Sequence, residues 1–357
     1  MLNKKPGEQK MEAITQKADS FSKVKDYMFF LTLWLLLFVL SITALCLGRY
    51  GIPISDVLDV LSSKLLGKPS NVNQTIENII LNLRLPRIIA SIVIGGSLAL
   101  AGAAYQGIFR NPLVSPDILG VSSGAGLGAA LAILFHLGTF GLQISSLAGG
   151  ILAVMITSAI PKFMKNSSTI ILVLGGIIVN GMMVSLLGLA KYMMDTENKL
   201  AEITYWLLGS LAKISKGDIM MISIPMVVSM LLLLAIRWRV NILALGESEA
   251  KNLGVNTEFY RGLVIVLSTI LTACAVSVSG TIGWIGLIVP HLGRMLIGPD
   301  NKRLFPLSII IGGGFLLLID TLSRIVSPAE LPISILTGLV GAPFYFWILH
   351  KQRMNMT

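Results

Sequence analysis

Charged side chains are scarce in this sequence: 13% of its 357 residues are charged, whereas 54% are hydrophobic. With a mean hydropathy of +0.81, this composition argues against a soluble domain of this length. The net charge is +10, but the basic residues are scattered through short segments between apolar runs and form no basic face with interleaved aromatics. The pattern therefore disfavours nucleic-acid binding and is typical of a polytopic membrane protein.

Residues that build metal and nucleotide sites are equally scarce. The three histidines, His136, His291 and His350, are too scattered for a metal constellation, and the two cysteines, Cys46 and Cys274, lie in apolar runs without CxxC spacing. No GxxxxGK[ST] loop is present, and no Ser/His or paired-Asp set lies at matching depth in neighbouring runs. We expect no metal site and no enzymatic activity, and ATP, if used, must be bound by another chain.

What the sequence has in abundance is apolar runs long enough to cross a bilayer. One nearly continuous run, residues 261–297, is too long for a single span, so we expect a tight reversal at "SVSGTIG". With that division we predict ten spans, at about residues 28–47, 87–106, 118–136, 142–160, 169–190, 219–236, 261–278, 281–297, 306–324 and 332–349.

The loop charges predict the orientation of these spans. The side of the N-terminus carries 18 of the 28 Lys and Arg residues and the opposite side carries 10, which places both termini in the cytoplasm. We therefore expect a cytoplasmic polar tail (1–27), a single transmembrane domain (28–350) and a second cytoplasmic tail (351–357). Outside, residues 54–67 have one apolar stripe and predict a helix lying on the surface.

Three polar segments face the cytoplasm in this topology. "ALGESEAKNLGV" (244–255) lies between two apolar runs and is too short and too polar to cross a bilayer. The other two segments are "QGIFRNPLVSPDILG" (106–120) and "GLIVPHLGRMLIGPDNKRLFP" (286–306), and both contain prolines. In the first of them, the prolines rule out one continuous helix. Small-residue runs at 94–104, 175–181 and 311–315 predict close helix packing.

These segments together resemble a known family. The ordered pattern "LRLPR", "GAAYQGIFRNPLVSPDILG", "ALGESEAKNLGV", "GTIGWIGLIVPHLGRMLIGPDNKRLFP" and "LPISILTGLVGAPFYFWIL" is similar to the permease subunit of bacterial ABC importers for iron-siderophores, haem and cobalamin, the FecCD type. The resemblance runs from about residue 30 to residue 350. Three positions depart from it: Asn301 where His is common, Trp284 where Phe is common, and Ala329 where Gly often precedes Glu-Leu-Pro.

The resemblance implies an all-α polytopic protein with the type II ABC importer permease architecture. It also implies that 244–255 is the coupling helix that docks on the ATP-hydrolysing subunit. The residues of this contact would be Leu245, Gly246, Glu247, Ala250, Leu253 and Gly254, with a secondary cytoplasmic contact at Arg110, Asn111, Pro112, Arg294 and Asp300. From the residues alone, a solvated helix at the membrane surface is the alternative.

At the outer mouth the resemblance implies docking of a substrate-binding protein. Arg84, Arg87 and Arg324 would receive acidic residues from its lobes. The structural alternative is that Arg87 extends toward the interface and that Arg324 pairs with Asp320, four residues earlier. Polar residues at membrane depth are candidates for the translocation path, here Gln106 and Asn180.

The sequence thus predicts one half of a permease dimer in the bacterial cytoplasmic membrane, surrounded by lipid. Its partners would be an identical or different second permease, two ATP-binding subunits that use ATP and Mg, and an extracytoplasmic binding protein. The chain itself would hold no cofactor. We expect inward transport of an iron-siderophore complex, with haem or cobalamin as alternative cargo. A secondary transporter driven by an ion gradient is the alternative from another class.

Overall fold

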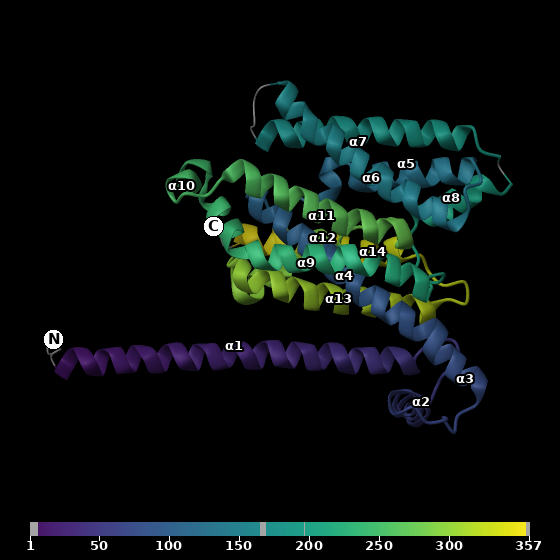
Figure 1. The fold of residues 1–357 in the computed structure, drawn as a ribbon, viewed down its shortest axis with the longest axis horizontal. Helices are drawn as coiled ribbons and strands as arrows, with labels where there is room; N and C mark the ends of the chain where they lie inside the picture. Colours follow the sequence, from purple (N-terminus) through teal and green to yellow (C-terminus); the bar gives the residue numbers. More distant parts are fainter. Residues whose placement is uncertain (1–5, 165–168, 196, 355–357) are drawn as a thin grey trace.

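The computed structural model describes residues 6–164, 169–195 and 197–354, and the regular elements in these ranges are helices (Figure 1). In chain order they are α1 (Pro6–Cys46), α2 (Ile54–Leu66), α3 (Gln74–Asn78), η1 (Ile79–Arg84), α4 (Leu85–Phe109), η2 (Pro116–Leu119), α5 (Val121–Leu134), α6 (Gly138–Phe163), α7 (Thr169–Tyr192), α8 (Lys199–Leu207), α9 (Lys216–Leu245), α10 (Glu247–Asn252), α11 (Thr257–Ser279), α12 (Ile285–Ile297), α13 (Asn301–Val326) and α14 (Ile333–Met354).

The apolar helices agree with the runs seen in the sequence. Within the described ranges, seven helices are long and apolar enough to cross a membrane, and three shorter apolar helices, α5, α12 and α14, coincide with the remaining predicted runs. The all-helical fold is confirmed, whereas the number of crossings and the side of each terminus stay predictions. The expected polar tail differs in form: residues 6–27 continue α1 as helix, and 351–354 end α14. Residues 1–5 and 355–357 lie outside the described ranges.

Helix α4 is the centre of the fold, with α9, α11, α12 and α13 around it (Figure 1). Glycines allow this close packing: a methyl group on Gly95 would overlap the carbonyl of Gly312 on α13, and one on Gly102 would overlap Gly286 on α12. Because lipid gives helices no hydrophobic reason to associate, such backbone contact supplies much of the attraction between them. The small-residue run at 94–104 therefore packs against protein, as the sequence predicted.

Two smaller groups flank this centre. Helices α5, α6, α7 and α8 lie together on one side, and α1 lies on the opposite side with α2 beyond its C-terminal end (Figure 1). The external surface helix expected at 54–67 is present as α2, which buries Val57 and Val60 in a cluster with Leu45 of α1. Its exposed face keeps large apolar side chains such as Leu65.

The chain is interrupted inside the bundle at two points. The reversal at "SVSGTIG" is confirmed, because α11 ends at Ser279 and α12 begins at Ile285. The second interruption corrects the sequence analysis: only the first part of 106–120 stays at the end of α4. Its second part, η2, returns beside the middle of α7, where a methyl group on Gly176 would overlap the carbonyl of Ile118, and Thr157 of α6 donates to the carbonyl of Leu119 at 3.0 Å.

The prolines explain this return. Pro112 and Pro116 cannot donate backbone hydrogen bonds, so the segment between them cannot continue α4 as helix. Irregular backbone at membrane depth is tolerated where protein or a water-filled cavity surrounds it. Helix α5 consequently starts deep in the bundle and has only 14 residues.

Candidate functional site

Helix α10 forms a short arm at the end of the molecule where α1 begins and α14 ends (Figure 1). The arm starts at Gly246, whose φ of 135° suits glycine and breaks α9 from α10. Ala250 faces inward and is buried, whereas Leu245 and Leu253 are 59% and 60% exposed. The arm therefore presents two large apolar side chains, one at each of its ends, to whatever lies beyond this surface.

A carboxylate joins α10 to the neighbouring helix. Glu247 accepts from Lys251 at 2.9 Å within the arm and pairs with Arg261 of α11 at 3.4 Å. The hydrogen bond from Lys251, with help from Arg261, holds the pKa of Glu247 below its ordinary value of 4.5. Glu247 is thus ionised at neutral pH and fixes the arm against α11.

Part of the predicted secondary contact lies beside this arm. Arg110, which ends α4 with a φ of 52°, has a guanidinium nitrogen 3.4 Å from the place where a Cβ on Gly246 would lie. Asn111 accepts from the backbone N–H of Leu113 at 2.9 Å and, like Pro112, is exposed.

Asp300 and Arg294 complete the predicted secondary contact in different ways. Asp300 caps α13 by accepting from the N–H of Lys302 at 2.9 Å, and it also accepts from the side chain of Asn241 near the end of α9. Asn241 in turn accepts from the N–H of Asn301 at 2.8 Å, so the start of α13 is tied to the end of α9. Arg294 instead points inward.

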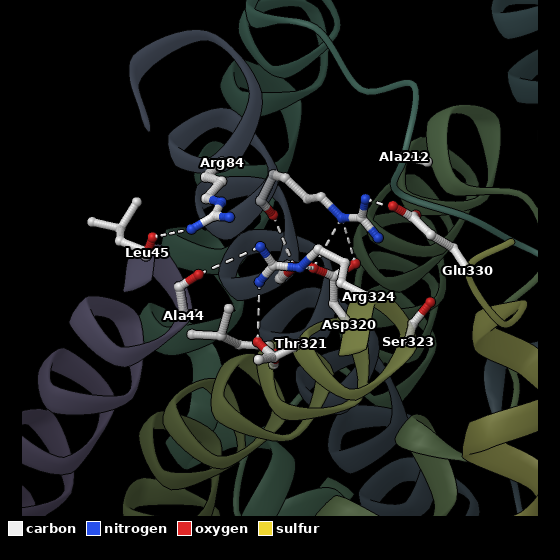
Figure 2. A network of polar contacts seen from close by, with 12 residues as sticks. Ala44, Leu45, Arg84, Ala212, Asp320, Thr321, Ser323, Arg324 and Glu330 are labelled. Carbon is white, nitrogen blue, oxygen red and sulfur yellow. Dashed lines mark hydrogen bonds and ion pairs between the residues drawn. The ribbon is translucent and has the colours of Figure 1, made fainter. Parts of the chain in front are cut away.

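At the other end of the molecule, two of the three predicted docking arginines, Arg87 and Arg324, pair with acidic residues, and Figure 2 shows Arg324 beside Asp320. Arg87 donates through Nε to both carboxylate oxygens of Asp320, at 2.8 and 3.0 Å, and through a terminal nitrogen to Glu330 at 2.9 Å. Arg324 lies 3.4 Å from Asp320 and donates to Thr321 at 3.2 Å. Asp320 is fully buried, whereas Glu330 remains partly exposed on the loop before α14.

Arg84 is held differently from the other two arginines. Its guanidinium donates to the backbone carbonyls of Leu45, at 2.5 Å, of Cys46, at 3.2 Å, and of Tyr50. It thereby fastens the C-terminal end of α1 to η1. All three arginines are only 6–7% exposed. The pairing of Arg324 with Asp320, offered as the structural alternative, is observed, and docking stays a prediction that requires these groups to exchange partners.

The predicted pathway residues have different surroundings. Gln106 is buried between α4 and α12, where it donates to the carbonyl of Gly286 at 3.2 Å and accepts from Arg294. Asn180 is half-buried at the middle of α7, and its backbone lies beside Gly120, the residue before α5. Asn180 therefore lies beside the interrupted segment of the bundle, whereas Gln106 is held between α4 and α12.

Sequence reasoning missed a hollow at that segment. It has a volume of about 320 Å³ and is lined by Asp117, Ser122, Thr281, Ile282, Gly283, Trp284 and Ser334. A smaller cavity adjoins it and shares Asp117 and Trp284. The available signal was an acidic residue one position after Pro116, between two apolar runs. Its place between two predicted spans indicates a cytoplasmic loop, whereas η2 lies inside the bundle beside α7 and α6.

Comparison with known proteins places these features in a family. The model of the FecCD transport family matches residues 35–351. Over 335 residues the chain is 39% identical to the molybdate import system permease protein MolB of Haemophilus influenzae, covering 94% of this chain and 97% of that protein. It is 40% identical over 275 residues to a probable iron chelatin transport system permease protein of Helicobacter pylori, covering 77% of this chain and 83% of that one.

A solved structure agrees with the sequence relatives. The chain superposes with a TM-score of 0.82 and 39% identity on a structure described as an inward-facing conformation of a putative metal-chelate type ABC transporter, covering 91% of this chain and 99% of that one. The family match, the relatives and the apolar helices lead to one conclusion. The chain belongs to the FecCD transport family and is a multi-pass permease subunit of an ABC importer in the cytoplasmic membrane, whose ATPase is a separate subunit.

Proposed function

We propose that this permease pairs with a second permease to form the pathway for inward transport of an iron-siderophore complex. Two ATP-binding subunits, using ATP and Mg, would drive the cycle from the cytoplasmic side, and an extracytoplasmic binding protein would deliver the cargo at the opposite end. The proposal includes ten crossings with both termini in the cytoplasm. The iron chelatin relative supports this cargo.

The observation that carries the proposal is the shape of the α10 arm. Its two exposed leucines, Leu245 and Leu253, flank a charged helix that Glu247 fixes to α11. Small apolar contacts with a charged rim are typical of a docking surface between proteins. Because α10 directly connects α9 to α11, a force applied to the arm reaches two long helices that pack on central α4. Such an arrangement suits a lever that converts ATP-driven movement into a change of the pathway.

Co-purification of the importer in detergent tests the arm. Glu247→Arg combined with Leu253→Asp reverses a charge and inserts another on the proposed docking surface. We expect the wild type to retain the ATPase. The double variant should retain at least about tenfold less of it, because disrupting a hot-spot residue of an interface commonly costs about 1.4 kcal/mol or more of binding free energy. A variant that retains the ATPase and full transport would show that α10 is a surface helix without a coupling role.

A matched control is available on α2. Leu65 is 90% exposed at the opposite end of the molecule, so Leu65→Asp introduces the same charge far from the arm. We expect this variant to insert, dimerise and retain the ATPase like the wild type. Loss of the ATPase from both variants would indicate general misfolding and would contradict a specific role of α10.

The cargo needs its own measurement, because molybdate is a specific second candidate. The similarity to the molybdate permease covers nearly the whole chain. The complete importer is reconstituted in vesicles with its binding protein. These vesicles should accumulate a radioactive ferric siderophore when ATP is supplied on the side of the membrane that carries the ATPase. Accumulation of radioactive molybdate without accumulation of the ferric complex would replace the proposed cargo.

A further inference from the structure

The hollow near η2 has an unusual inner surface. Asp117 comes from η2, Ser122 from the first turn of α5, Thr281 and Trp284 from the segment before α12, and Ser334 from the first turn of α14. Three regions that are distant in sequence, 117–122, 281–284 and the start of α14, therefore meet at one cavity of about 320 Å³. A volume of this size corresponds to roughly ten water molecules at about 30 Å³ each, which is enough for a hydrated ion or part of a larger chelate.

Each hydroxyl group that lines this hollow already donates its proton in a hydrogen bond. Ser122 donates to the carboxylate of Asp117, Thr281 donates to the carbonyl of Leu207, and Ser334 donates to the carbonyl of Thr281. Each hydroxyl has one proton and two acceptor lone pairs. Since carbonyl oxygens cannot donate, the hydroxyl oxygens of Thr281 and Ser334 can offer only lone pairs to a molecule in the hollow. Toward such a molecule these two hydroxyl groups therefore act as acceptors.

Asp117 is the acidic group of this surface. It is the one charged side chain in the lining, it is exposed to the hollow, and within the described ranges no ion pair joins it to a basic side chain. The indole of Trp284 lies beside it, held by α14: a Cβ on Gly341 would lie 2.9 Å from Cγ of the indole. Trp284 has a φ of 73°, a conformation that a bulky residue adopts only when its surroundings impose it. An aromatic ring next to a carboxylate is favourable for a cation.

The N-terminus of α5 opposes the charge of an ionised Asp117 only in part. Helix α5 begins at Val121, close to Asp117, and a helix N-terminus carries roughly +0.5 of an elementary charge. At the start of α12, the amide of Ile285 donates to the carbonyl of Gly283 and that of Leu287 to the carbonyl of Trp284. A full carboxylate charge of about −1 exceeds the half charge of the α5 terminus. With Asp117 ionised, its carboxylate therefore outweighs the N-terminus of α5.

We propose that this hollow is a cation-binding station of the transport pathway, with the Asp117 carboxylate as its charged contact and Trp284 as its aromatic wall. The class of ligand is a cation that keeps its own ligands: a positively charged part of a metal chelate, or a hydrated counter-ion. A bare metal ion is a poor fit, because the described residues hold no cluster of three or more His, Cys, Asp or Glu. The site thereby disfavours oxyanion cargo.

The assignment of the cation to the cargo rests on the proposed transport function, whereas the site itself does not. Fluorescence of Trp284 tests the site in the purified permease without ATP or cargo. Caesium ions and iodide ions both quench indole on contact but have opposite charges. The fluorescence of Trp284 is obtained by subtracting the fluorescence of the Trp284→Phe variant from that of the wild type. This step is needed because four other tryptophans also fluoresce: Trp34, Trp206, Trp238 and Trp347.

We expect Asp117→Asn to lower the caesium quenching constant of Trp284 by about threefold and to raise the iodide constant, because one nearby charge changes local ion concentrations by this order. Asp117→Glu should restore the wild-type values. As a matched control, Asp59→Asn removes an acidic residue on α2 and should change neither constant. Equal constants in the wild type and Asp117→Asn would show a carboxyl group that is protonated or shielded, and would overturn the proposal.

Transport distinguishes the two sources of the cation. Two ferric trihydroxamate chelates of the same shape, one with a pendant ammonium and one with a pendant carboxylate, are supplied to the reconstituted importer on saturating binding protein. We expect the wild type to transport the ammonium form about threefold faster and Asp117→Asn to lose this preference. Equal rates in the wild type, together with charge-dependent quenching, would assign the site to a counter-ion and overturn its role in cargo selection.

Failure of the proposed function gives a different result. If the importer carries neither chelate, or if the ATPase does not co-purify, the proposed cargo or coupling is wrong. The quenching constants of the permease alone still report on the hollow in that case. Retention of the ATPase by Asp117→Asn, measured in the same preparation, shows that the variant is folded and assembled.

Discussion

The two ends of this permease were both predicted to dock partners, yet they are built in opposite ways. At one end, the α10 arm leaves Leu245 and Leu253 exposed, and its ion pairs lie near the surface. At the other end, Arg84, Arg87 and Arg324 are buried and held by groups of their own chain, as Figure 2 shows for Arg84 and Arg324. The first surface is already prepared for a partner, whereas the second must rearrange to receive one.

The difference follows from the cost of burying charge. A guanidinium group near the apolar part of a bundle is expensive unless carboxylates or carbonyls surround it, so the chain supplies Asp320, Glu330 and the carbonyl of Leu45. A leucine at a polar end has no such requirement and stays exposed until another protein covers it. A charged residue at the end of a helix can therefore either support the fold or form an interface, and the sequence motif looks the same in both cases.

The largest expected effect comes from breaking the buried network. Asp320→Ala leaves Arg87 and Arg324 without their shared buried carboxylate. Removing one partner of a buried ion pair commonly costs about 3–5 kcal/mol, so we expect a loss of that order in the free energy of unfolding in detergent. The matched variant at the opposite end, Lys251→Ala, removes an exposed pair and should cost less than about 1 kcal/mol. Similar losses in both variants would contradict the contrast between the two ends.

A smaller effect is expected from Glu330, the partly exposed member of the network. If the binding protein contributes a carboxylate to Arg87, that carboxylate competes with Glu330. Glu330→Gln should then strengthen binding of the binding protein by about fivefold, on the order of 1 kcal/mol, as measured by surface plasmon resonance on the solubilised importer. As a control, Glu77→Gln removes one negative charge from α3 at the same end. Unchanged affinity in Glu330→Gln would argue against docking at Arg87.

The link between α10 and α11 gives a still smaller prediction. Arg261→Met keeps an apolar side chain of similar length and removes the pairing with Glu247. A pair of this exposure contributes roughly 0.5 kcal/mol, so transport should fall by about twofold with the ATPase still bound. Transport and ATP hydrolysis are measured in the same vesicles. Loss of the ATPase itself would show that Arg261 belongs to the docking surface and does not merely position the arm.

The smallest effect concerns acid. The pKa of Glu247 is lowered in the folded protein, so its contacts stabilise the fold at pH values above its ordinary pKa of 4.5 and lose that contribution as the pH falls through the lowered value. The stability difference between the wild type and Glu247→Gln should be constant from about pH 8 to about pH 5 and then shrink. The whole stability difference should be less than about 1 kcal/mol, and thermal unfolding of the permease measures it. A difference that grows in acid would show that the sign is wrong.

Much of the fold could be read from the sequence because lipid imposes simple rules. Each predicted apolar run coincides with a helix, the reversal before Ile285 is present, and the external helix at 54–67 packs through Val57 and Val60. Glycine runs marked the seams of α4 with α12 and α13, since only a residue without Cβ permits backbone contact there. The family resemblance was confirmed by the family match.

The sites were harder to read because they depend on depth. Gln106 and Asp117 are both polar residues near the same interruption, and the sequence selected the first for the pathway. The structure buries Gln106 between Arg294 and the carbonyl of Gly286, and it exposes Asp117 to the hollow. Hydropathy records how apolar a segment is, but not whether a polar segment returns into the bundle.

The sequence by itself determined that this is an all-helical membrane permease, because a long apolar segment in lipid must satisfy its backbone as helix and the ordered motifs specify the family. Only the tertiary structure decided what the charged residues do. The direction of η2 places Asp117 in a cavity, and the packing of α4 against α13 gives Arg87 its carboxylates. These outcomes depend on which side chains from distant segments meet, and local composition does not encode that meeting.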